Sequence, residues 1–196
     1  MAVSAVVFDF GYTIVNEDRV WSEIARQYGW AESVFFATLG AVIERRGRHT
    51  QVLDILGAPH PPEPVPFEPR DFYDDALPSL RSLKADGHVV GIAGNFSTEI
   101  EGFLREQADV DFIASSERWG VEKPDPRFFA RIADEAGCRG EEITYVGDRI
   151  DNDVLPAAAA GMAAVFLHRG PWAAVQKSWP EAAGATTISD LGSVPV

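Results

Sequence analysis

The segment from residue 6 to residue 13 reads VVFDFGYT, an apolar run that stops at an aspartate and a glycine. The unbroken apolar stretch Ala5 to Phe8 is typical of a short strand buried on both faces of a parallel sheet. Helical periodicities separate most of the apolar runs that follow it. The alternation predicts an α/β fold with a doubly wound parallel sheet of five strands. The other four expected strands are Val89 to Ala93, Phe112 to Ala114, Ile143 to Val146 and Ala163 to Leu167.

One long interval interrupts this alternation after the first strand. Residues 15–73 contain no strand pattern but three amphipathic segments, around Ile24, Leu39 and Val52. They end in APHPPEPVPFEP, residues 58–69, whose prolines cannot continue a helix and favour a stiff, extended segment. We therefore expect a core domain made of residues 1–14 and 74–196, and a small helical insert, residues 15–73, with a proline-rich return linker.

Composition limits the classes of function. The chain has 196 residues, 46% of them hydrophobic and 24% charged, as in a globular domain. Its net charge of −13 argues against binding to nucleic acid or to an anionic membrane. No apolar run has the length of a membrane span and no signal peptide is recognisable, so we expect a cytoplasmic protein. A single cysteine, Cys138, excludes an internal disulfide, and a small molecule is the expected partner.

Acidic or small polar residues, or a glycine, end three of the expected strands, and a lysine lies in the loop after the remaining early strand, the third. Asp9 ends the first strand, Gly94 and Asn95 end the second in GIAGNFS (residues 91–97), and Asp148 ends the fourth in YVGDRIDNDV (residues 145–154). Lys123 lies in the loop GVEKPDP (residues 120–126). In an open α/β sheet, ligands bind outside the carboxyl ends of the strands, where these residues are expected to meet.

The acidic residues predict a metal. Two carboxylates about 4 Å apart repel each other by roughly 4 kcal/mol at an effective dielectric constant near 20, and a divalent cation relieves that repulsion. Asp9, Asp148 and Asp153 offer hard oxygen ligands, with no histidine or cysteine nearby in sequence. Mg²⁺ is therefore favoured over zinc.

The four segments, in this order and spacing, resemble the four motifs of the haloacid dehalogenase (HAD) superfamily, most of whose members are Mg²⁺-dependent phosphatases. The similarity spans residues 3 to about 172, and the insert matches the position of that family's helical C1 cap on a Rossmann-like core. The resemblance implies a hydrolase of phosphoric monoesters, acting on a small phosphorylated metabolite.

The resemblance also assigns roles to residues. Asp9 would be the nucleophile that forms an aspartyl-phosphate, and Lys123 would neutralise it together with the transferring phosphoryl group. Mg²⁺ would be held by Asp9, by the backbone carbonyl of Gly11 and by Asp148, while Asp153 would orient Lys123 or support the metal. The substrate-binding positions implied are Thr13, Gly94, Asn95 and Lys123.

Two positions depart from the family pattern. The family usually has a second aspartate, a general acid and base, where this chain has Gly11, and a serine or threonine that binds the phosphoryl group where this chain has Gly94. Loss of general acid catalysis costs about 10² to 10⁴ in rate, so substrates with good leaving groups are favoured. Asn95, Ser97 or a backbone N–H are candidates to replace the missing hydroxyl.

The departures leave two other hypotheses open. Carbon–halogen hydrolysis releases halide without a proton, which agrees with Gly11, but the segment from Gly147 to Asp153 resembles the metal-binding form. The third hypothesis is a protein that keeps the fold and binds a phosphorylated ligand or a protein partner without turnover. A basic cluster in the insert either contacts an anionic substrate or is a solvated helix face. Tyr12 and Trp21 either line a pocket or belong to the core of the insert, and the Thr13 hydroxyl bonds either the phosphoryl group or its own loop. The cluster comprises Arg45, Arg46, Arg48 and His49.

Overall fold

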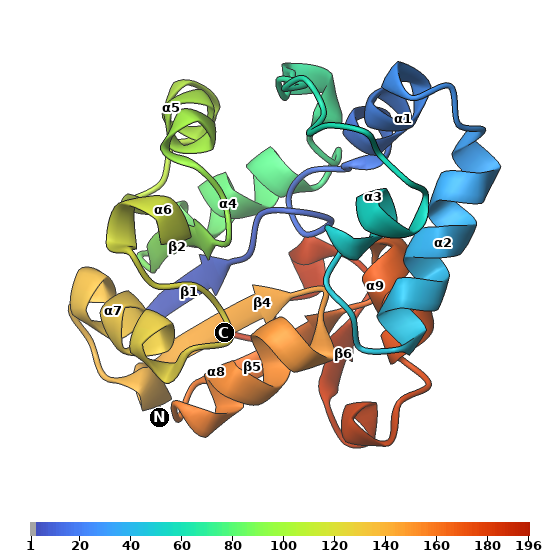
Figure 1. Cartoon of the computed structure of the whole chain (residues 1–196). Coiled ribbons are helices and arrows are strands. Elements are labelled where there is room, and N and C mark those ends of the chain that lie inside the picture. The colour runs from blue at the N-terminus through green and yellow to red at the C-terminus, as the bar shows by residue number, and fades with distance from the viewer. Residues whose placement is uncertain (1–2) are drawn as a thin grey trace.

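The computed structural model describes residues 3–196 and has a parallel sheet at its centre (Figure 1). Its strands are β1 (Ala5–Phe8), β2 (Val89–Gly94), β3 (Phe112–Ser115), β4 (Ile143–Gly147), β5 (Ala163–Leu167) and β6 (Thr186–Ile188), in the order β3-β2-β1-β4-β5-β6. The predicted doubly wound parallel α/β sheet is confirmed, but it has six strands rather than five. The additional strand, β6, pairs with β5 at an edge and has two exposed threonines, so its sequence lacks the apolar run of the others.

The order of the strands reverses beside β1, which lies between β2 and β4. Phe8, the last residue of β1, is level with Ile92 of β2 and with Val146 of β4. The next residue, Asp9, donates its backbone N–H to the Val146 carbonyl at 2.9 Å. The ends of β1, β2 and β4 therefore meet at one point, which is the usual ligand-binding position in open α/β sheets.

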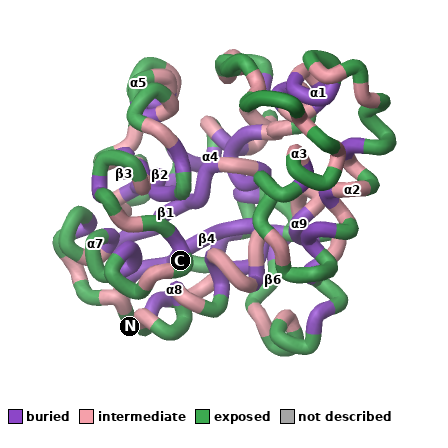
Figure 2. Tube along the Cα trace, viewed as in Figure 1, coloured by how far each residue is buried: buried purple, intermediate pink, exposed green. Residues whose placement is uncertain are grey.

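Helices cover both faces of the sheet. Val6 and Phe8 of β1 belong to a core shared with α4 (Ala76–Ala85) and α5 (Thr98–Gln107). Ala5 and Val7 face the opposite way, into a core shared with α7 (Pro126–Ala136) and α8 (Leu155–Ala159). Burial on both faces explains why the sequence of β1 is continuously apolar (Figure 2). A short helix, α6 (Ser116–Trp119), follows β3.

The predicted helical segments of the insert are α1 (Asp18–Gln27), α2 (Glu32–Glu44) and α3 (Gln51–Ile55). Leu39 and neighbouring apolar side chains of α2 pack against Trp172 of α9 (Gly170–Gln176), so the insert contacts the core through a buried apolar cluster. The proline-rich return segment lies along α1, because the Tyr28 hydroxyl donates to the His60 carbonyl at 2.7 Å. That residues 15–73 form a separate domain remains a prediction.

Among residues 3–196, no helix combines the length and the apolar character needed to cross a bilayer.

Candidate active site

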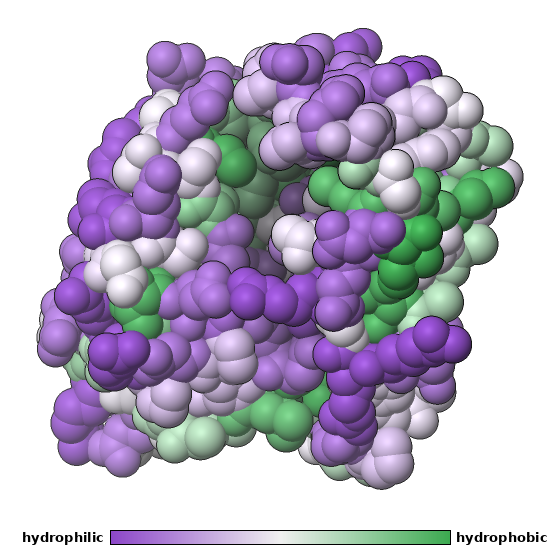
Figure 3. All heavy atoms as spheres, in the orientation of Figure 1, coloured by the Kyte–Doolittle hydropathy of each residue, from purple (hydrophilic) through white to green (hydrophobic). Residues whose placement is uncertain are grey.

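A cavity of about 150 Å³ opens between the carboxyl ends of the central strands and the helical insert. In Figure 3 the same face of the molecule is hollowed at its middle, between α5 and the insert helices. Its lining combines acidic, basic and aromatic side chains. The cavity is lined by Asp9, Phe10, Gly11, Tyr12, Glu17, Trp21, Leu39, His49, Asn95, Phe96, Lys123, Asp148, Arg149, Asn152 and Trp172.

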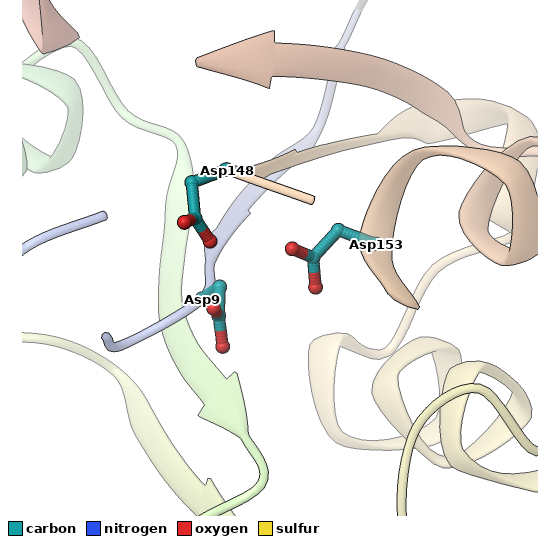
Figure 4. A group of neighbouring side chains, drawn as sticks. All are labelled: Asp9, Asp148 and Asp153. Atoms are coloured by element: carbon teal, nitrogen blue, oxygen red, sulfur yellow. The ribbon is translucent and has the colours of Figure 1, made fainter. Parts of the chain in front are cut away.

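Three buried carboxylates converge at the base of this cavity. Asp9, Asp148 and Asp153 each offer a carboxylate oxygen within 4.8 Å of the others, and the side chains point toward one another (Figure 4). Burial, with the charges of Asp153 and Asp9, raises the pKa of Asp148 well above its usual range. Burial also raises the pKa of Asp153 to about 6, against the opposing effect of Lys123. The cluster therefore needs positive charge if all three groups are to be ionised.

Lys123 supplies one positive charge. Its Nζ donates to Asp9 Oδ1 and to Asp153 Oδ1, both at 2.6 Å, and its side chain is 1% exposed. Although burial alone would lower the pKa of Lys123, the carboxylates of Asp153 and Asp9 raise it well above its usual range. The ammonium group is thus protonated and bridges Asp9 and Asp153.

Neighbouring side chains hold Lys123 in this position. The Asn95 amide accepts from the Lys123 backbone N–H at 2.8 Å and donates to the Lys123 carbonyl at 3.0 Å. The Lys123 ammonium also donates to the Tyr145 hydroxyl at 3.1 Å, and that hydroxyl donates to the Ala93 carbonyl at 2.9 Å. Asn95 thus ties the loop before α7 to the end of β2, and its predicted contact with substrate remains a prediction.

Asp153 lies on a π-helical turn, Ile150–Val154, that follows β4. Its Oδ2 accepts from the Arg149 backbone N–H at 3.0 Å, while its Oδ1 accepts from Lys123. A Cβ on Gly147 would lie 2.4 Å from the Asp153 carboxyl carbon, so glycine is needed there for the close approach. Since both its oxygens accept hydrogen bonds, Asp153 is better placed to orient Lys123 than to bind a cation directly.

The hydrogen bonding of Asp148 differs from that of Asp153. It is 1% exposed, and among the residues that the structure describes none donates a hydrogen bond to its Oδ2. Leaving a buried carboxylate oxygen without a partner is costly. The unpaired oxygen, beside Asp9 and in an all-oxygen donor set, fits a hard divalent cation. The predicted ligands Asp9, Asp148 and Asp153 are thus together, and Gly11 lines the same cavity.

Two of the predicted substrate-binding residues have little room for that role. A Cβ on Gly94 would lie 2.5 Å from Asp9 Oδ1, which explains the absence of a larger residue at this position. Thr13 is fully buried, is not among the cavity-lining residues, and its Oγ1 has no hydrogen-bond partner within residues 3–196. Both roles remain predictions.

The basic cluster of the insert is divided between surface and cavity. Arg46 pairs with Glu181 and Arg48 with Glu122, and all four side chains are well exposed. His49 reaches the cavity, where its ring lies 5.5 Å from that of Trp21. Trp21 and Tyr12 both line the cavity. Tyr12 also belongs to the buried apolar cluster of the insert and Trp21 packs against that cluster, so the two interpretations of these aromatic residues are compatible.

Several residues in or beside the cavity were not anticipated from the sequence. Tyr145, which is buried beneath the cavity and contacts Lys123, lies within an apolar strand, and nothing in that pattern distinguishes it from core. Arg149 pairs with Asp151 and places its guanidinium 3.6 Å from the centre of the Trp172 ring. Glu17 precedes α1, where an acidic residue reads as an ordinary helix start. Burial raises the pKa of Glu17 to about 7.

Comparison with known proteins agrees with this arrangement. The model of the haloacid dehalogenase-like hydrolase family matches residues 3–161. A glyceraldehyde 3-phosphate phosphatase from Methanopyrus kandleri is 29% identical over 87% of this chain and 86% of its own. Phosphatase MT3486 from Mycobacterium tuberculosis is 30% identical over 86% and 89%. The crystal structure of a dehalogenase superposes with a TM-score of 0.69 at 19% identity, over 96% of this chain and 94% of the other.

The chain therefore belongs to the haloacid dehalogenase-like hydrolase family, as the motifs predicted. The structural match at 19% identity establishes the fold alone. The curated relatives named as phosphatases support the prediction of a hydrolase that resembles those acting on phosphoric monoesters.

Proposed function

We propose that the protein is a Mg²⁺-dependent phosphatase of a small phosphorylated metabolite, with Asp9 as the nucleophile. One observation carries the proposal: Asp9 lines the cavity, is held by the Lys123 ammonium at 2.6 Å and lies beside the unpaired oxygen of Asp148. Phosphoryl transfer needs little more than a positioned nucleophile and positive charge around the phosphoryl oxygens. The names of the curated relatives support the same class of substrate.

The chain's own residues would act as follows. The Asp9 side chain is 11% exposed, so its carboxylate is reachable from the cavity and would attack phosphorus to give an aspartyl-phosphate. Lys123, fixed by Asn95 and Asp153, would neutralise the phosphoryl charge. Asp9, Asp148 and the Gly11 carbonyl would hold Mg²⁺, which when bound supplies further positive charge at the phosphoryl oxygens.

The size of the cavity and its walls bear on the substrate. Trp21, Leu39 and Trp172 line the cavity on the side of the insert and of α9. A volume of about 150 Å³ holds a phosphoryl group with a small leaving group. We therefore infer a small substrate with an apolar or aromatic part, and residues 15–73 as the cap that encloses it.

Carbon–halogen hydrolysis on the same fold is the main rival. It requires an aspartate nucleophile but no cation, and it leaves the unpaired, buried Asp148 Oδ2 without a role. This is the reason to prefer phosphoryl transfer.

The test is phosphate release from aryl, acyl, sugar and alkyl phosphates, with Mg²⁺ or with a chelator, by the wild type and by Asp9→Asn. We expect turnover that requires Mg²⁺ and is lost in Asp9→Asn. Halide release from a 2-haloacid in the presence of chelator, with no phosphate release, would support the rival. Tight binding of phosphorylated compounds without turnover would support a ligand-binding protein instead.

A further inference from the structure

The carboxyl group of Glu17 occupies the space that a side chain at position 11 would fill. A Cβ built on Gly11 would lie 2.8 Å from the carboxyl carbon of Glu17 and 2.8 Å from each of its oxygens. Gly11 is two residues from Asp9 in the loop after β1, whereas Glu17 comes from the start of α1 in the insert. Both line the cavity with Asp9. The insert thus places a carboxyl group next to the nucleophile loop.

Few contacts of the protein hold this carboxyl group in place. Glu17 is partly buried, yet within residues 3–196 it forms no ion pair, and its Oε2 accepts one long hydrogen bond, from the Trp21 indole at 3.4 Å. The buried carboxylates elsewhere in the protein differ: Asp71 is paired with Arg19, and Glu101 with Arg118. A half-buried carboxyl group without a cationic partner is costly, which points to a use in the cavity.

The proposed reaction needs a group that exchanges protons. When a phosphoryl group moves to Asp9, the departing oxygen takes the electron pair of the broken P–O bond and needs a proton unless its conjugate acid is strong. When water then attacks the aspartyl-phosphate, that water must lose a proton. A single group near Asp9 can serve both steps, as acid and then as base.

The other proton-bearing groups of the cavity are engaged elsewhere. The Lys123 ammonium bridges Asp9 and Asp153. The Tyr12 hydroxyl donates to Asp18 at 3.0 Å, and burial raises the pKa of Tyr12 far above its usual range. Arg149 keeps its proton at any working pH. These groups are therefore poor proton donors to a leaving group.

Among the cavity groups that the proposed function does not assign to the cation, His49 is the remaining competitor. Its ring lies 5.5 Å from the ring of Trp21 at the cavity, which Arg149 also lines. The protein atoms around the ring, together with the charges of Arg149 and Arg48, lower the pKa of His49, which disfavours the protonated imidazolium that would act as the acid. His49 is included in the test below for this reason.

We propose that Glu17 is the general acid and base of the reaction, an inference that rests on the proposed phosphatase function. In the first step an Asp9 oxygen forms a bond to phosphorus, the P–O bond to the leaving group breaks, and the leaving oxygen takes the Glu17 proton. In the second step the Glu17 carboxylate takes a proton from water, whose oxygen bonds to phosphorus. The P–O bond to Asp9 then breaks, and its electron pair restores the Asp9 carboxylate. The products are an alcohol and inorganic phosphate, and Glu17 is protonated again.

The test begins with Glu17→Gln, which keeps the size of the side chain and an oxygen that can accept from the Trp21 indole. On an alkyl phosphate such as glycerol phosphate, we expect kcat to fall by about 10² to 10⁴. On p-nitrophenyl phosphate, whose leaving group needs little protonation, the first step is expected to survive. Breakdown of the aspartyl-phosphate still lacks its base, so p-nitrophenol should appear in a burst close to one equivalent per enzyme, followed by slow turnover.

Matched variants separate this role from others. Glu23→Gln removes a carboxylate from the same helix, outside the cavity, and should leave both activities unchanged. In Glu17→Ala the side chain no longer occupies the space beside position 11, so the double variant Gly11→Asp with Glu17→Ala returns a carboxyl group to the loop. We expect the double variant to exceed Glu17→Ala at least tenfold on the alkyl phosphate. The regain would show that the carboxyl group, rather than the shape of residue 17, is what matters.

Three outcomes would overturn the assignment. Glu17→Gln could keep its alkyl phosphatase rate while Asp9→Asn is inactive, which would leave the proposed function intact and remove Glu17 from it. The activity lost in Glu17→Gln could be restored by a higher Mg²⁺ concentration, which would make Glu17 a metal ligand. His49→Asn could show the leaving-group dependence in its place. If Asp9→Asn is as active as the wild type, the proposed function itself fails.

Discussion

The Cβ that any residue other than glycine would bring to position 94 lies 2.5 Å from Oδ1 of Asp9. The Asp9 carboxylate therefore leaves no room for a side chain at the end of β2. In this chain the glycine at position 94 is a requirement of the site, although from the sequence it looks like the loss of a phosphate-binding hydroxyl.

Gly94→Ser should consequently lower activity instead of restoring a family feature. The added Cβ pushes the Asp9 carboxylate away from Lys123, and we expect kcat for p-nitrophenyl phosphate to fall at least tenfold in a protein that stays folded. Gly102→Ala is the matched control, because a Cβ on Gly102 in α5 meets no atom within 4 Å. The control should keep full activity and gain up to about 1 kcal/mol of unfolding free energy. Higher activity in Gly94→Ser would contradict the proposed position of Asp9.

Lys123→Met is expected to destabilise the fold as well as abolish activity. The substitution leaves the buried carboxylates of Asp9 and Asp153 without their cation, and breaking a buried pair in this way costs about 3 to 5 kcal/mol. Urea unfolding at neutral pH measures the loss. Arg26→Met, which breaks the exposed pair with Glu32, should cost less than about 1 kcal/mol. Equal effects of the two substitutions would show that the buried cluster does not depend on Lys123.

Mg²⁺ should stabilise the folded protein through Asp148. At 100 times its dissociation constant a ligand adds about 2.7 kcal/mol, or roughly 5 to 10 °C in Tm for a domain of this size. Thermal unfolding with and without Mg²⁺ measures the shift. We expect Asp148→Asn to remove it and Glu23→Gln to keep it. A shift of the same size in Asp148→Asn would place the cation elsewhere.

The Arg19–Asp71 pair predicts a pH-dependent part of the stability. Burial alone would raise the pKa of Asp71, but the hydrogen bonds from Arg19 lower it below the ordinary value of 3.8. The pair therefore stabilises the fold above that value, and the contribution is lost as pH falls through the lower pKa of the folded state. Arg19→Met should cost about 1 to 3 kcal/mol at pH 7. The difference from the wild type should narrow well below pH 3.8, and a difference independent of pH would contradict the assignment.

Much of the site could be predicted from the chain because parallel strands bring their carboxyl ends to one edge. That rule, applied to the strand ends and the loops after them, singles out Asp9, Asp148, Asp153 and Lys123, and the resemblance to the family assigned their roles. The strand β6 could not be found in the same way, because two of its three residues are exposed threonines. The position of β6 is set by its pairing with β5, a strand that is not adjacent to it in the sequence.

Glu17 and Gly94 show a different limit of the sequence. The role of each residue depends on a contact with another segment of the chain. The Glu17 carboxyl group lies beside Gly11, and Gly94 lies beside the Asp9 carboxylate. A linear pattern marks Glu17 as a helix start and Gly94 as a missing hydroxyl. Only the distances between these segments show that one fills a space and the other keeps a space free.

The most direct test of the account is to trap the covalent intermediate. The enzyme would be mixed with acetyl phosphate labelled at phosphorus, in the presence of Mg²⁺, quenched in acid and digested. The account predicts label on the peptide that contains Asp9, released by hydroxylamine as expected for an acyl phosphate, and none in Asp9→Asn. Label that persists in Asp9→Asn, or phosphate release from the wild type through a labelled residue other than Asp9, would contradict it.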